Sequence, residues 1–155
     1  HGFTLGSTSI VIQSHIIGMF LPSLITGRLI KKFGHSTIIY SGALIYLICI
    51  FLSFYDQTFI NYLIALVLLG IGWNFLFIGG TSLLVLCYQE NEKFKVQGFN
   101  DVLVFSIQSI ASLTAGYSIL KFSCNEINLA CIPLVLLIIL VSIRADIYKK
   151  NIIDA

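Results

Sequence analysis

The sequence predicts an all-α, polytopic membrane protein with five transmembrane helices. Of its 155 residues, 57% are hydrophobic and only 10% are charged, and the mean hydropathy is +0.97. The apolar residues form five stretches, each close to the roughly 20 residues that a helix needs to cross a hydrocarbon core about 30 Å thick. The predicted spans are residues 5–25, 37–54, 62–86, 102–120 and 127–143. A composition this apolar excludes a soluble globular domain.

The basic residues predict how the spans are oriented. Eight of the nine Lys and Arg residues fall between spans one and two, between spans three and four, or after span five, and Lys121 alone falls on the other side. Because positive residues favour the cytoplasmic side, these three segments are expected in the cytoplasm. The N-terminus of the chain is then outside and the C-terminus inside. The eight residues are Arg28, Lys31, Lys32, Lys93, Lys95, Arg144, Lys149 and Lys150.

The beginning of the sequence suggests a fragment. The chain starts with His1 instead of Met, and the first span follows almost at once. We therefore expect residues 1–150 to form a transmembrane bundle and residues 151–155 a cytoplasmic tail. A net charge of +2, with basic residues beside the spans, favours the lipid bilayer as partner and gives no indication of nucleic-acid binding.

Three of the five spans carry polar residues along one helical face. Amide, imidazole and carboxylate groups are costly against lipid, so these faces are expected to turn toward neighbouring helices or a water-filled cavity. Spans two and five are almost entirely apolar, which is typical of supporting helices that face lipid. The polar faces contain Thr4, Thr8, His15, Gly18 and Pro22 in the first span, Gly70, Asn74, Phe77 and Thr81 in the third, and Asp101, Phe105, Gln108 and Ser112 in the fourth.

The polar residues of these faces have two interpretations. His15 is either a neutral histidine that hydrogen-bonds across a helix pair, or a cavity-lining group that handles protons. Asn74 and Gln108 either join two helices or line a pathway. Asp101, expected near the start of the fourth helix, is favoured there by the helix dipole. Trp73 serves packing or forms a platform for a substrate.

No motif predicts catalysis, a cofactor or a metal site. The four cysteines show no CxxC spacing, and we interpret them as small buried thiols. The glycines Gly70, Gly72, Gly79 and Gly80 predict close helix approach or local bending of the helix. The sequence lacks a Walker loop, GxSxG and HExxH, so we expect no enzyme. The cysteines are Cys49, Cys87, Cys124 and Cys131.

The segment GRLIKKFGH at residues 27–35 resembles a degenerate copy of the loop signature of the major facilitator superfamily, G-x-x-x-D-[RK]-x-G-x-[RK]-[RK]. Gly27, Lys32 and Gly34 match the signature, whereas Lys31 replaces its acidic residue and Ser36 one of its basic residues. Three other segments strengthen the resemblance: GMFLPS at 18–23, GIGWNFLF at 70–77 and KVQGFND at 95–101. Together they resemble the C-terminal half of bacterial permeases of this family.

The resemblance implies that the five spans are helices eight to twelve of a twelve-helix transporter in a bacterial inner membrane. Helices eight, ten and eleven would border the central pathway, with nine and twelve as supports. A small solute would move by alternating access, driven by a gradient of the solute or of a coupling proton or ion, together with the missing N-terminal half. The implied pathway residues are His15, Trp73, Asn74, Gln108 and Ser112; Gly27, Lys32 and Gly34 would position the loop.

A second hypothesis stays open at this stage. The chain could be a small membrane scaffold or accessory subunit that acts only through helix contacts. That hypothesis predicts that His15, Asn74 and Gln108 pack without any cavity.

Overall fold

The structure, a computed structural model, describes residues 4–55 and 58–153, and these residues are helical with no strand. The all-α prediction is confirmed. In order, the elements are α1 (Leu5–Phe20), α2 (Ser23–Phe33), α3 (His35–Tyr55), α4 (Phe59–Leu84), two short 3-10 helices η1 (Val85–Cys87) and η2 (Glu90–Glu92), α5 (Lys93–Lys121) and α6 (Cys124–Ile153).

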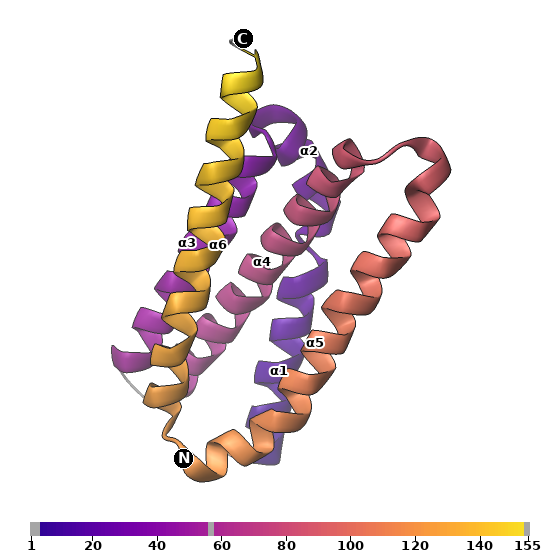
Figure 1. Cartoon of the computed structure of the whole chain (residues 1–155). Coiled ribbons are helices and arrows are strands. Elements are labelled where there is room, and N and C mark those ends of the chain that lie inside the picture. The colour runs from indigo at the N-terminus through magenta and orange to yellow at the C-terminus, as the bar shows by residue number, and fades with distance from the viewer. Residues whose placement is uncertain (1–3, 56–57, 154–155) are drawn as a thin grey trace.

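Within the described ranges, four helical segments are long and apolar enough to cross a membrane, and the bent pair α1–α2 makes a fifth if it is one span. The chain runs up and down between two ends (Figure 1). The α2–α3 turn, the η1–η2 corner and the end of α6 lie together at one of them. We call this the basic end, because Lys31, Lys32, Lys93 and Arg144 lie in these segments. Lys121 lies at the other end.

The first predicted span is bent in the structure. α1 ends at Phe20, α2 begins at Ser23, and the two axes differ by 40°. The break lies at Pro22, which has no backbone N–H and whose ring clashes with the carbonyl four residues earlier. The chain becomes helical again at once, because the N–H groups of Ile25 and Thr26 both donate to the Pro22 carbonyl at 2.9 Å.

The predicted basic turn is also mostly helical. Gly27 and Lys32 lie inside α2, so the expectation that they belong to a loop is wrong. Gly34 does form the turn, with a φ of +85°, a conformation that glycine adopts without steric cost. Its N–H donates to the Ile30 carbonyl at 2.8 Å and ends the helix. The turn between α2 and α3 therefore consists of little more than this one residue.

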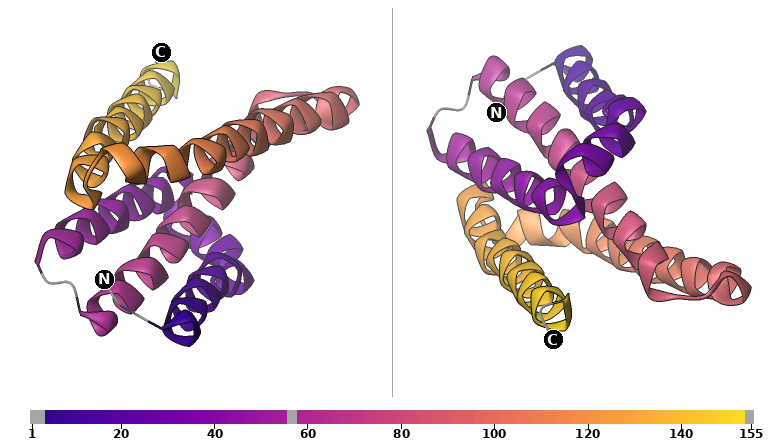
Figure 2. Two further views of the ribbon diagram at one scale, coloured as in Figure 1. Left: turned by 90° about the horizontal axis from the view of Figure 1, so that it is seen from below. Right: turned by 90° about the horizontal axis from the view of Figure 1, so that it is seen from above.

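α4 lies at the centre of the bundle, against α1 on one side and α3 on the other (Figure 2). The contact with α1 is made through Gly18 and Gly70, where the two backbones nearly touch. On the α3 side, Gly42 and Gly72 allow a similar approach. Such small residues let membrane helices gain van der Waals contact without a hydrophobic driving force. The predicted close approach is thus confirmed for Gly70, Gly72 and Gly79, and it is wrong for Gly80, where a Cβ atom would meet nothing within 4 Å.

α6 is attached to the outer side of α3 by an apolar cluster and a polar contact. Ala43 and Ile50 of α3 pack with Val135 of α6. At the basic end, the Asp146 carboxylate accepts hydrogen bonds from the hydroxyls of Ser36 and Tyr40, the latter at 2.8 Å. Two hydroxyl groups thus satisfy a carboxylate at the first turns of α3, where the positive end of the helix dipole also favours it.

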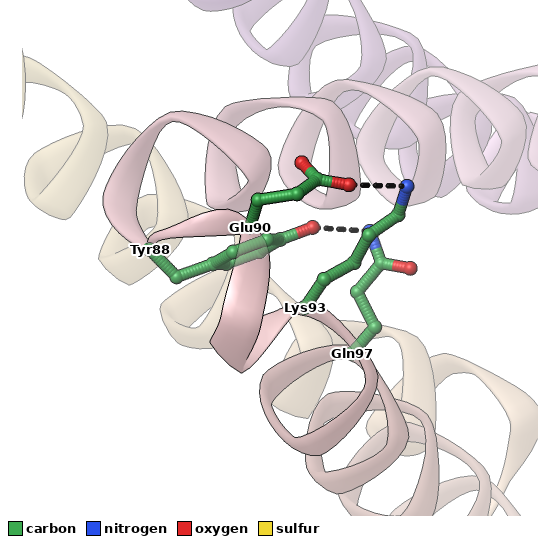
Figure 3. A network of polar contacts seen from close by, with 4 residues as sticks. All are labelled: Tyr88, Glu90, Lys93 and Gln97. Carbon is green, nitrogen blue, oxygen red and sulfur yellow. Dashed lines mark hydrogen bonds and ion pairs between the residues drawn. The ribbon is translucent and has the colours of Figure 1, made fainter.

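α5 stands apart from the rest of the bundle, as the two end-on views show (Figure 2). None of its residues is buried. Its start is held by the corner drawn in Figure 3, where Lys93 pairs with Glu90 at 3.3 Å and the Gln97 amide donates to the Tyr88 hydroxyl. The fold therefore leaves most of the length of α5 exposed.

Candidate functional site

Asn74 supports the break between α1 and α2. Its side chain is 1% exposed, and its amide N–H donates to the Met19 carbonyl at 2.7 Å. The Thr26 hydroxyl lies 2.7 Å from Asn74 Oδ1 and 2.8 Å from the Pro22 carbonyl. At a proline break, backbone carbonyls of the preceding turn lose the N–H groups that would bond them in a continuous helix. An unpaired carbonyl in a membrane interior costs several kcal/mol. Asn74 satisfies one such carbonyl and joins α4 to both parts of the broken helix.

His15 lies in the same interface, toward the other end of α1. Its Nδ1 is 2.8 Å from the Leu66 carbonyl of α4. Because a carbonyl only accepts, Nδ1 carries the proton in this contact. The structure thus brings His15 and Asn74 together along the α1–α4 contact, in the geometry expected of polar residues that join two helices.

Trp73 belongs to a group of aromatic side chains that crosses three helices, which we call the aromatic row: Phe20, Trp73, Phe77 and Phe105. Trp73 and Phe77 of α4 stack at 4.7 Å between ring centroids, with planes 10° apart. Phe20 of α1 meets Trp73 edge-on at 6.5 Å, and Phe105 of α5 lies 6.3 Å from Phe77. Phe20 and Phe105 are 61% and 51% exposed. The row therefore presents open ring surface along the face that α1, α4 and α5 share.

Gln108 and Ser112 lie beside the aromatic row on α5. Together with Phe105 and Ser109 they line a groove of about 480 Å³. His15 and Asn74 belong instead to the α1–α4 contact. The predicted polar residues thus divide into a pair within the helix contact and a pair on the open face.

The sequence predicted Asp101 near the start of a helix, and the structure differs. α5 begins at Lys93, so Asp101 lies eight residues inside it. There it lines a cavity of about 320 Å³ between the end of α4 and the start of α5, which we call the corner cavity. The Asn100 amide lies 3.4 Å from the Asp101 carboxylate. The corner cavity is lined by Phe77, Thr81, Ser82, Leu84, Val85, Gln97, Asn100 and Asp101.

Several residues of this site escaped the sequence analysis. Thr26 falls between the predicted first span, which ended at residue 25, and the basic segment 27–35, although Pro22 four residues earlier was a signal for a helix break. Phe20 and Gln97 have no local signal, because their partners lie on other helices or beyond a corner. Among the described residues, no three His, Cys, Asp or Glu side chains form a group that could hold a metal ion.

Comparisons with known proteins find transporters that are similar to this chain in sequence. The chain is 34% identical to the riboflavin transporter RfnT of Brucella anthropi over 139 residues, which cover 90% of this chain and 35% of the relative. It is 35% identical to the uncharacterized MFS-type transporter YddS of Bacillus subtilis over 145 residues (88% and 33%). A second Bacillus subtilis transporter of this type, YdeG, is 42% identical over 106 residues (67% and 25%).

The chain thus spans about a third of the length of the first two of these relatives. No family model matches it, and no solved structure does either. Its apolar helices define a polytopic membrane protein, and the relatives that it resembles are named as transporters. Within that class, the chain belongs to the major facilitator superfamily. These relatives are consistent with the resemblance to the C-terminal half of such permeases.

Proposed function

We propose that this chain is the C-terminal transmembrane bundle of a secondary transporter that moves a small solute across a bacterial inner membrane by alternating access. The observation that carries the proposal is the open face of α1, α4 and α5. It combines the aromatic row with Gln108, Ser112 and Asp101, and such polar groups are costly against lipid. A second bundle across a solute pathway would give this face a suitable environment.

The arrangement of the helices supports one additional partner, an absent helix. Each half of these transporters contains two inverted repeats of three helices. If α4, α5 and α6 form one repeat, then α1–α2 and α3 correspond to the last two helices of the other, and its first helix is missing. α4 packs on α1 and α3, so its counterpart would pack on α5 and α6.

A cavity supports this position for the absent helix. It measures about 560 Å³ between α3, α4 and α6, with Ile119 of α5 at its edge. Most of its lining is apolar, including Leu69, Leu134 and Ile138. An apolar helix placed there would cover this surface and the bare side of α5 together. We infer that the absent helix and N-terminal half are the principal partners of this chain.

The site residues receive distinct roles in this proposal. Trp73, Gln108 and Ser112 face the pathway and contact the solute. His15 and Asn74 hold α1 against α4, so that the broken helix moves as one body with the bundle. Gly34 sets the α2–α3 turn, and the basic end lies in the cytoplasm because it carries nearly all the positive charge.

The relative from Brucella anthropi is named as a riboflavin transporter, and the aromatic row offers stacking surface suited to such a ring system. We therefore propose a flat heteroaromatic solute, with riboflavin as the first to test. The full-length gene product is expressed in riboflavin-auxotrophic bacteria, and uptake of tritiated riboflavin is measured with and without a protonophore. Saturable uptake above that of the empty vector is expected. Its absence, with the protein present in the membrane, would refute riboflavin as the solute.

A further inference from the structure

The corner cavity and the aromatic row form one continuous surface with two kinds of chemistry. Phe77 belongs to both, since it stacks on Trp73 and also lines the corner cavity. On one side of Phe77 the surface consists of aromatic rings. On the other side, toward the basic end, hydroxyl, amide and carboxylate groups line the surface together with the apolar side chains of Leu84 and Val85.

We propose that the solute joins a flat conjugated ring, which stacks on the aromatic row, to an uncharged hydroxylated chain that enters the corner cavity, and that Asp101 excludes the phosphorylated form. The inference rests on the proposed transport function and assigns the chemistry of that same pathway.

Three polar groups of the corner cavity can accept hydrogen bonds from a ligand, and Ser82 and Asn100 can also donate. The Thr81 hydroxyl donates to the Phe77 carbonyl at 2.7 Å, so its oxygen is left to accept. The Gln97 amide donates one of its two N–H groups to the Tyr88 hydroxyl (Figure 3), and its carbonyl oxygen can accept a hydrogen bond from a ligand. Asp101 adds a carboxylate, which only accepts. Hydroxyl groups of a solute supply the protons that these oxygens need.

A phosphate group, unlike a hydroxyl group, carries negative charge and mainly accepts hydrogen bonds. It carries about −1.5 to −2 charges near pH 7 and three strong acceptor oxygens. Asp101 is the one charged side chain among the lining residues of the corner cavity and of the groove beside Gln108 and Ser112 on α5. Lys93, at the start of α5, is paired with Glu90 at 3.3 Å. A phosphate in the corner cavity would therefore face a carboxylate without a compensating cation.

The test compares a flavin with its 5′-phosphate ester as inhibitors of tritiated flavin uptake by the full-length gene product. In the wild type, unlabelled flavin should compete, whereas the phosphate ester should be at least about tenfold weaker. Asp101→Asn keeps the size of the side chain and removes its charge, so it should reduce this ratio severalfold. Glu126→Gln, which removes one negative charge at the opposite end of α5–α6, is the matched control and should keep the wild-type ratio.

A second arm tests the stacking surface. Phe77→Leu and Phe105→Leu should each raise the KM for the flavin about 2- to 10-fold, because an aromatic pair is lost. Phe99→Leu is the control, since Phe99 is equally a phenylalanine of α5 but lies outside the aromatic row. All three variants are compared at equal membrane abundance.

The outcomes separate the inference from the proposed function. Saturable flavin uptake that the phosphate ester inhibits as strongly as the flavin overturns the inference alone. The inference is also overturned if Asp101→Asn leaves the ratio of inhibition by flavin and by phosphate ester unchanged. It is overturned as well if Phe77→Leu and Phe105→Leu raise the KM for the flavin no more than Phe99→Leu does. Absence of flavin uptake in the wild type overturns the proposed solute, and this inference with it.

Discussion

Replacing Gly70 by alanine should force α1 and α4 apart. A Cβ atom at position 70 would lie 2.5 Å from the His15 carbonyl oxygen and 2.9 Å from the Met19 nitrogen. Ordinary contacts of this kind begin near 3.4 Å, so one helix must move by roughly 1 Å to make room. Both obstacles are backbone atoms of α1, so no side-chain rotation relieves the clash.

The energetic cost follows from overpacking and from the polar contacts that the movement disturbs. An added methyl group in a tightly packed region typically costs about 1–3 kcal/mol. The displacement also stretches the 2.8 Å contact of His15 with Leu66 and the 2.7 Å bond from Asn74 to Met19. We expect Gly70→Ala to lower the free energy of unfolding by about 2 kcal/mol.

The assay is thermal stability of the detergent-purified full-length protein, measured from the monodisperse fraction that survives heating. Gly80→Ala is the matched control on the same helix, because a Cβ atom there meets nothing within 4 Å. Alanine favours helix over glycine by about 1 kcal/mol, so this control should equal or exceed the wild type. Equal midpoints for the two variants would refute the reasoning from close backbone approach.

Four other predictions follow from the same structure. Asn74→Leu should lower the free energy of unfolding by about 1–3 kcal/mol and reduce membrane abundance, because the Met19 carbonyl loses its donor. Gln108→Ala should instead reduce transport at unchanged abundance. Immunoblots of the membrane fraction and uptake assays compare the two variants. Asp146→Ala should cost about 2 kcal/mol of stability, since two hydroxyl hydrogen bonds between α3 and α6 are lost, and an unchanged thermal midpoint would contradict it. The cysteine of Lys32→Cys should be labelled from the cytoplasm and that of Asn125→Cys from outside, because positive residues favour the cytoplasmic side and the basic end carries most of them. Labelling of both from the same side would contradict this topology. The 155-residue product alone should be degraded or aggregate in the membrane and be rescued by co-expression of the absent segments, whereas a stable, monodisperse and active chain would favour an accessory subunit.

The spans were predictable because a membrane imposes a simple rule on the backbone. Every N–H and C=O group in hydrocarbon must be paired within the segment, so apolar stretches of sufficient length become helices. The predicted span 37–54 lies within His35–Tyr55, and the structure differs by two residues or fewer at either end. The predicted fourth span began at residue 102, whereas α5 begins nine residues earlier, at Lys93. Hydropathy locates the part of a helix that lies in lipid, and the helix can extend beyond that part.

By itself, the sequence determined the class of fold, the number of apolar spans and the residues that lipid would not tolerate. Only the tertiary structure decided which of these residues meet. Asn74 pairs with Thr26 across 48 positions, and Asp146 with Ser36 across 110. The aromatic row draws its members from three helices. Helical periodicity determines which residues share a face, but it carries no information on which other helix that face contacts, because neighbours are chosen by packing between distant segments.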